Sequence, residues 1–281
     1  VLQVCHGVAE HIARYDGFAR ALNEQGIVVA GHDHLGHGKS LPEGGTPVYF
    51  GDGNTWNTVV DDIYVLHQRL KQRYPDVPLC IMGHSMGSFL TRTYLIRYPG
   101  TVKAAVIMGT GWQPRAAITG GLALANAIAA VSGENATSEL VTELAFGSYN
   151  KLFSPNRTKV DWLSADESNV DDYIADPLCG ADATVGLFRQ MLHGIRFNQR
   201  QSHLRQMDRE MPVLFVAGDK DPVGSCGKGV RQTYDAFRAA GMRDCTLKLY
   251  PGLRHEILNE KAYAADITKN IEAWLLSRLE K

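Results

Sequence analysis

The sequence predicts an α/β fold with a mostly parallel sheet, helices on both faces of the sheet and an inserted block of helices. Short apolar runs, which are typical of strands buried in a parallel sheet, alternate with amphipathic helical stretches near both ends of the chain. The stretch 113–209 contains no convincing buried strand. A Gly-x-Ser-x-Gly sequence stands between one apolar run and the helical stretch that follows it, as in many α/β enzymes.

The expected elements alternate in the order that βαβ units require. The expected strands cover residues 1–5, 27–30, 79–82, 103–108, 211–218 and 245–250. The expected helices lie within residues 15–25, 52–74, 227–240 and 256–279, and one more follows Gly87 and ends at Tyr98. We therefore expect a core formed by residues 1–112 and 210–281, with residues 113–209 as a helical cap over the sheet.

The central motif is Gly83-His84-Ser85-Met86-Gly87, which follows the apolar run 79–82. So tight a turn from strand to helix needs neighbours without side chains, and Gly83 and Gly87 meet that need. Ser85 is then expected in a strained conformation, with its hydroxyl exposed above the sheet. The motif predicts that Ser85 is a nucleophile, and a purely structural glycine-rich turn is the alternative.

The composition is that of an ordinary soluble globular protein, with 44% hydrophobic and 21% charged residues. A formal net charge of -1 gives no electrostatic reason to expect nucleic acid or an anionic membrane as a partner. The five cysteines are scattered, which favours free thiols in a reducing compartment and a cytoplasmic location. The chain begins within an expected strand, so an upstream targeting segment is left open.

Two stretches allow more than one interpretation. The loop 31–40 contains His32, His34 and His37, and their spacing favours a glycine-rich turn with local hydrogen bonds over a metal site. The stretch 116–133 carries no charge and barely reaches the length of a membrane span. We expect it to line an apolar substrate entrance or to touch a lipid surface, with a core helix of the cap as the alternative.

A serine nucleophile needs a base within hydrogen-bond reach and a carboxylate that orients the base. Asp219 and Asp221 follow one late strand and His255 follows the next, which are the positions expected for the carboxylate and the base in this type of sheet. Spacing alone does not show which of the two aspartates is the acid. The backbone N–H groups of Met86 and of the loop 6–8 are candidate donors to the oxyanion that forms on the attacked carbonyl.

At this point the sequence resembles the monoacylglycerol lipases and lysophospholipases, a group of serine hydrolases also labelled serine aminopeptidase S33-like. The resemblance lies in four segments: His6-Gly-Val-Ala-Glu10-His11-Ile-Ala-Arg14-Tyr15, Asp33-His-Leu-Gly36-His37-Gly38-Lys-Ser40, Gly83 to Gly87, and Gly218-Asp-Lys-Asp221 with Tyr250 to Glu260. Within the expected cap, the segment 173–180 resembles bacterial members. The resemblance implies an α/β-hydrolase fold with a cap domain.

Carried over residue by residue, the resemblance implies Ser85 as the nucleophile, Asp221 rather than Asp219 as the acid, and His255 as the base. It implies the N–H groups of Val8 and Met86 as the oxyanion hole. Glu10 and Arg14 match positions that face the glycerol end of the substrate; an ion pair that braces their loop is the alternative. Leu258 stands where the mammalian lipases have a second histidine, which puts a strict preference for monoacylglycerol in doubt.

These observations together predict a serine esterase that acts through an acyl-enzyme on single-chain lipid esters, without cofactor or metal. An aminopeptidase or amidase on the same triad is the first alternative, and Asp166, Glu167, Asp171 and Asp172 are then candidates to bind the amine. A binding protein on a hydrolase scaffold is the second. The expected partner is a small acyl ester or lipid, with transient contact between the cap and a membrane surface and no nucleic acid.

Overall fold

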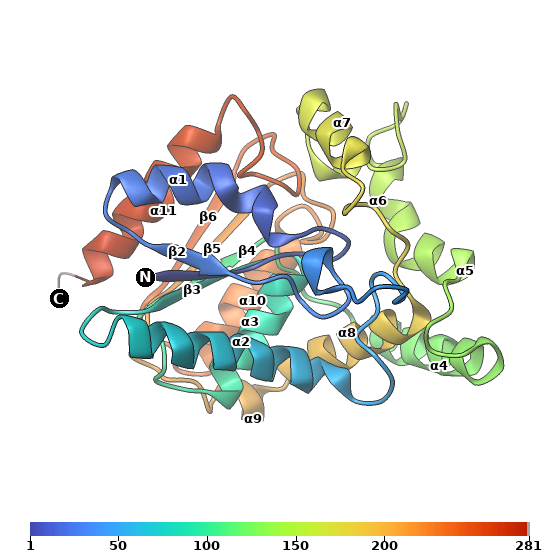
Figure 1. Ribbon diagram of the computed structural model, residues 1–281, viewed down its shortest axis with the longest axis horizontal. Helices are drawn as coiled ribbons and strands as arrows, with labels where there is room; N and C mark the ends of the chain where they lie inside the picture. Colours follow the sequence, from blue (N-terminus) through green and yellow to red (C-terminus); the bar gives the residue numbers. More distant parts are fainter. Residues whose placement is uncertain (280–281) are drawn as a thin grey trace.

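A computed structural model describes residues 1–279. Its centre is a six-stranded, fully parallel sheet with the strand order β2-β1-β3-β4-β5-β6 (Figure 1). The strands are β1 (Leu2–Cys5), β2 (Val29–Gly31), β3 (Cys80–His84), β4 (Ala105–Met108), β5 (Val213–Gly218) and β6 (Cys245–Tyr250). The predicted fold class and all six predicted strands are confirmed, with boundaries that move by one or two residues.

Helices cover both faces of the sheet, as the sequence predicts. They are α1 (Asp16–Glu24), α2 (Thr55–Arg73), α3 (Met86–Arg97), α10 (Lys228–Ala239) and α11 (Ala264–Leu279). Apolar side chains of α1 and α11 pack with one face of the sheet, and those of α2, α3 and α10 pack with the other (Figure 1). The apolar positions Ile267 and Ile271 of α11 are fully buried, which is what their helical spacing indicates.

No strand lies between β4 and β5 within the described residues, and this stretch consists of loops and helices. Its α-helices are α4 (Arg115–Ser132), α5 (Glu139–Thr142), α6 (Ser148–Lys151), α7 (Glu167–Ala175), α8 (Val185–Asn198) and α9 (Gln201–Leu204). α8 packs against α2 and α3, where the Thr93 hydroxyl donates to the Asn198 side chain at 2.8 Å. Part of this stretch therefore contributes to the layer over the sheet, and the division into core and cap at residues 113 and 209 stays a prediction.

The start predicted for the last helix is wrong, because α11 begins at Ala264 and not near Glu256. Residues 256–263 form turns, and two carboxylates in them bind distant partners. Glu256 binds Arg14, and Glu260 accepts hydrogen bonds from the backbone N–H groups of Ala165 and Asp166. These tertiary contacts outweigh the helical spacing of the segment.

Parallel pairing brings the ends of the central strands to one edge of the sheet. Cys5 of β1 pairs with Gly83 of β3, and Gly218 of β5 pairs with Tyr250 of β6. The loops that follow these strands carry the candidate site residues, so the sheet gathers them at its carboxyl edge, where ligands of open α/β sheets bind.

Candidate active site

Ser85 lies in a strained turn between β3 and α3. Its φ of 54° and ψ of -123° lie outside the regions that a non-glycine residue normally adopts, which confirms the strain predicted for it. A Cβ atom on Gly83 would collide with the Gly87 carbonyl, and one on Gly87 would collide with the Cys5 carbonyl. The motif therefore needs both glycines, and Ser85 stands at the amino end of a twelve-residue helix.

Asp221 and His255 meet in the interior above β5 and β6. His255 Nδ1 lies 3.0 Å from both carboxylate oxygens of Asp221, and Asp221 is fully buried. The backbone N–H of Val223 donates to the same carboxylate at 2.9 Å and helps to fix its orientation. Asp219 instead accepts the backbone N–H of Gly252, at a partly exposed position. The structure thus separates the two aspartates that sequence spacing left open.

The expected oxyanion donors lie on a loop and at the start of a helix. Met86 is the first residue of α3, and Val8 follows β1; both residues line a cavity together with Ser85. Neither N–H group donates a hydrogen bond to another residue in the part of the chain that the structure describes. Both donors are thus available to a bound oxyanion.

Two cavities meet at Ser85. The larger has a volume of about 460 Å³ and a mainly apolar lining from α4, α8 and the segment 141–149. The smaller cavity has a volume of about 240 Å³, and charged side chains line it together with His255. Val8, Ser85, Phe146 and Trp162 line both cavities.

α4 forms one wall of the larger cavity, which confirms the prediction that the uncharged stretch lines an apolar entrance. Ile118, Gly121 and Leu124 face the cavity, whereas much of the opposite side of the helix is exposed. Within residues 1–279, this helix alone is long and apolar enough to cross a membrane, on length and composition only.

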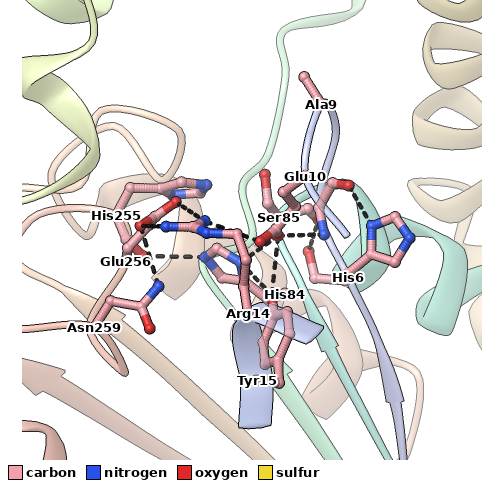
Figure 2. Close-up of polar contacts among 12 residues, drawn as sticks. His6, Ala9, Glu10, Arg14, Tyr15, His84, Ser85, His255, Glu256 and Asn259 are labelled. Carbon is pink, nitrogen blue, oxygen red and sulfur yellow. Dashed lines mark hydrogen bonds and ion pairs between the residues drawn. The ribbon is translucent and has the colours of Figure 1, made fainter. Parts of the chain in front are cut away.

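A buried charge network lies beside the cavities and joins the loop after β1 to the loop after β6 (Figure 2). The Arg14 guanidinium makes two hydrogen bonds to Glu256, at 2.6 and 2.8 Å, and one to Glu10 at 3.1 Å. Glu10 also accepts the backbone N–H of Gly7, next to Val8, at 2.5 Å. Burial alone would raise the pKa of Glu256, but the hydrogen bonds and charge of Arg14 hold that pKa below its ordinary value.

The same geometry bears on the role expected for Glu10 and Arg14. Glu10 lines the smaller cavity, whereas the Arg14 guanidinium is largely occupied by two carboxylates and the side chain of Asn169. Both residues are buried, so their pair is a braced interior contact and not an exposed one. Contact of Glu10 or Arg14 with substrate stays a prediction.

His84 connects this network to His255, and sequence reasoning gave it no role. Its Nδ1 lies 2.9 Å from the Tyr15 hydroxyl and 3.4 Å from Glu10, and its Nε2 bonds the backbone carbonyl of His255 at 3.2 Å (Figure 2). Burial disfavours the charged ring, but the hydrogen bond and charge of Glu10, with the charge of Glu256, raise the pKa of His84 above its ordinary value. His84 stands at a variable position of Gly-x-Ser-x-Gly, so no pattern in the sequence singled it out.

Trp162 is a second residue that sequence reasoning missed. Its ring centroid lies 5.1 Å from that of His255 and 6.1 Å from that of Phe146, to which it is parallel within 9°. The indole shields His255 from solvent on the side of the segment 141–163. A lone tryptophan gives no signal in the sequence of such a contact.

The loop 31–40, which contains the three histidines, packs against the loop after β1. The His37 ring bonds the Leu35 carbonyl, which confirms local hydrogen bonding for that histidine. His6 Nε2 accepts the backbone N–H of His34 at 2.9 Å, whereas the rings of His32 and His34 have no hydrogen-bond partner within residues 1–279. Burial lowers the pKa of His34 and of His37. Within residues 1–279 the one group of three potential ligands close enough for a single ion lies elsewhere, at His11, Asp176 and Cys179.

The acidic residues considered for binding an amine lie on or next to α7. Asp171 pairs with Arg157 at 2.6 Å, Asp172 lies 3.8 Å from Lys261, and Asp166 accepts the N–H of Ser168. None of Asp166, Glu167, Asp171 and Asp172 lines either cavity at Ser85. The structure does not bring this cluster to the nucleophile.

Comparison with known proteins gives consistent matches. A family model described as serine aminopeptidase, S33, matches residues 1–262. A monoacylglycerol lipase of Mycolicibacterium smegmatis is 31% identical over 284 residues, which cover 99% of this chain and 89% of that protein. The monoglyceride lipase of Homo sapiens is 27% identical over 277 residues, 98% of this chain and 82% of that protein.

The fold comparison agrees. A thermostable carboxyl esterase from Bacillus coagulans, solved in complex with glycerol, superposes with a TM-score of 0.92 at 27% identity, over 99% of this chain and 89% of that one. The family match covers most of the chain, and the mycobacterial relative matches it almost from end to end. The chain therefore belongs to the serine aminopeptidase S33 family of α/β hydrolases.

Proposed function

We propose that this chain hydrolyses carboxylic esters of single-chain lipids, such as monoacylglycerols, through an acyl-enzyme on Ser85. The observation that carries the proposal is the position of Ser85 where an apolar cavity of about 460 Å³ meets a smaller cavity with charged walls. An ester with one acyl chain fits this division, because its chain and its alcohol differ in polarity. The relatives named as monoacylglycerol and monoglyceride lipases support the same substrate class.

The geometry supports a conventional sequence of steps. Asp221 orients His255 through Nδ1, and the opposite ring nitrogen accepts the proton as Ser85 Oγ attacks the ester carbonyl. The N–H groups of Val8 and Met86 bind the oxyanion of the tetrahedral intermediate. His255 then protonates the leaving alcohol, which departs through the smaller cavity. Water, activated by His255, releases the fatty acid and restores Ser85.

An aminopeptidase would need a free carboxylate near Ser85 that binds the substrate's amine. Glu10 and Glu256 line the smaller cavity, but both are already paired with Arg14. Asp182 is the remaining acidic residue of that lining. Asp182 is thus the one carboxylate of this lining that could bind an amine, and the preference for an ester rests on the apolar cavity and on the relatives named as lipases.

The test compares wild type with Ser85→Ala by fluorophosphonate labelling and by turnover of a monoacylglycerol, a lysophospholipid and an aminoacyl anilide. We expect labelling and ester hydrolysis in wild type only, with kcat lower by roughly 10⁴–10⁶-fold in the variant and an unchanged melting curve. Preferred hydrolysis of the anilide would overturn the proposed substrate. Ester turnover within tenfold of wild type in Ser85→Ala would overturn the nucleophile.

A further inference from the structure

The packed helices α4 and α8 form a surface without acidic residues. No Asp or Glu occurs from Arg115 to Gly133 or from Val185 to Met207, although the chain as a whole carries 30 acidic and 29 basic residues. The only charged side chains of the two helices are Arg115, Arg189 and Arg196, and Arg200 follows α8 directly. The near-neutral net charge of the chain therefore hides a local excess of positive charge.

Three of these arginines surround one pocket of about 300 Å³. Arg115, Arg196 and Arg200 line it together with Ile118, Thr119 and Gln199, and a second pocket shares Arg196 and Arg200. Arg189 is neutralised by Glu134, but Arg115, Arg196 and Arg200 form no ion pair with any residue between 1 and 279. The Arg196 guanidinium donates a hydrogen bond to His193 Nδ1 at 2.9 Å, and the lining of this pocket contains no carboxylate.

Backbone donors add to the positive potential. α4 begins at Arg115, and its N-cap residue Pro114 makes no side-chain hydrogen bond to the first turn. The first N–H groups of an 18-residue helix thus lie beside the three guanidinium groups. Positive charges held close together repel one another, so a bound anion would stabilise them. The planar guanidinium groups match the oxygens of a phosphate.

We propose that the pocket of Arg115, Arg196 and Arg200 binds a phosphate group, and that the phosphate belongs to a phospholipid headgroup at a membrane surface. The adjoining surface favours this source. Ile118 lines both the arginine pocket and the larger cavity at Ser85, so the anion would sit beside the path of the acyl chain. This choice of source rests on the proposed lipid substrate.

The exposed side of α4 carries mainly small residues, and the segment after it exposes the apolar side chains of Leu140 and Leu144 beside Glu139 and Glu143. Ala116, Ala123, Ala127 and Ala130 are exposed at helical spacing, and Val131 is 88% exposed. Leu144, which lines the larger cavity, is 64% exposed. Small apolar residues, with arginines that lack a carboxylate partner at one end of α4, suit contact with an anionic lipid surface at that end. The carboxylates of Glu139 and Glu143 follow the opposite end of the helix.

The experiment measures sedimentation of the full chain with vesicles of phosphatidylcholine, with and without phosphatidylglycerol. It uses the Ser85→Ala background, so the result does not depend on turnover. The test variant combines Arg115→Gln, Arg196→Gln and Arg200→Gln. The control combines Arg69→Gln, Arg73→Gln and Arg231→Gln, which removes the same charge from exposed positions on α2 and α10. Melting curves establish that both variants fold.

We expect phosphatidylglycerol to strengthen binding of the parent chain. The test variant should lose roughly 100-fold in affinity for these vesicles, and the control less than about threefold. Equal losses in test and control would overturn the site, because only the net charge would then matter. Calorimetry with inorganic phosphate forms a second arm. Phosphate binding that requires the three arginines, without a difference in vesicle binding, would overturn the lipid source, and the absence of both would overturn the proposal.

Discussion

Arg14 holds Glu256 by two parallel hydrogen bonds, Nη1 to Oε1 at 2.6 Å and Nη2 to Oε2 at 2.8 Å. Glu256 directly follows His255, while the same guanidinium reaches Glu10, which binds the loop that carries Val8. One buried side chain thus joins the loop of the expected base to the loop of an expected oxyanion donor (Figure 2).

Replacing Arg14 by Met should destabilise the protein strongly, because two buried carboxylates would lose their shared cation. A loss of about 3–5 kcal/mol in the free energy of unfolding is expected, measured by urea denaturation. Arg20→Met is the matched control, since Arg20 makes an i,i+4 pair with Asp16 at the exposed surface of α1. The buried-network interpretation fails if the two variants lose similar stability.

Glu10 should act on the rate because it binds the Gly7 N–H and thereby holds in place the loop that carries the expected oxyanion donor Val8. Glu10→Ala removes the acceptor of that N–H and should lower kcat by roughly 10–100-fold with little change in KM, since a displaced oxyanion donor acts on the transition state. Glu10→Gln keeps an acceptor oxygen and should recover part of the loss. A change confined to KM would instead support the contact with substrate that the resemblance implies.

Asp221→Asn and Asp219→Asn should separate clearly in steady-state kinetics. The Asp221 variant should lose roughly 10³–10⁴-fold in kcat, because His255 would no longer be held in the orientation that accepts the serine proton. The Asp219 side chain accepts a hydrogen bond from the backbone N–H of Gly252, away from His255, and its variant should stay within about tenfold of wild type. The reverse order of effects would mean that Asp219 is the acid.

The larger cavity should give a preference for long acyl chains. Each buried CH₂ is worth up to about 0.8 kcal/mol, so burial of roughly two or three of the extra methylenes of octanoate should raise its kcat/KM above that of acetate esters by one to two decades. Leu124→Asp, which places a charge in the cavity wall, should remove most of that preference. Ala123→Asp places the same charge on the exposed side of α4 and should preserve it. Equal activity across chain lengths in wild type would contradict the assignment of this cavity to the acyl chain.

His84 should make stability depend on pH above the ordinary pKa of a histidine. Because its folded pKa lies above the ordinary 6.5, the charged ring adds stability that is fully present below about pH 6.5. That stability is lost as the pH rises through the raised folded pKa. The difference in free energy of unfolding between wild type and His84→Gln should therefore shrink above pH 6.5 in urea titrations. A difference that grows with pH would contradict the raised pKa.

The strands were predictable from the sequence because each combines a short apolar run with flanking turn residues, and such runs have few alternatives to a buried strand. Residues 256–263 were not, because Glu256 and Glu260 bind Arg14 and the backbone near residue 165. Contacts between residues so distant in sequence leave no trace in local periodicity.

The candidate site likewise contains residues that the sequence predicts and residues that it does not. Ser85, Asp221 and His255 each follow a strand, so their order and position are visible in the chain. The partnership of His84 with Glu10 and the packing of Trp162 on His255 are not, because each joins segments that only the folded sheet brings together. The conformation of Ser85 was predictable, since the two glycines beside it permit little else.

β4 and β5 are neighbours in the sheet, yet the whole of residues 113–209 lies between them in the chain. During synthesis from the amino end, the completed edge of β4 has no partner until β5 leaves the ribosome, roughly 5–20 s later at ordinary elongation rates. Val106 and Ile107, fully buried in the finished protein, border that open edge for the interval. Because the helices between β4 and β5 are synthesised first, the nascent chain exposes an apolar strand edge that can pair with another chain. A shorter connection would reduce the time during which this edge is unpaired.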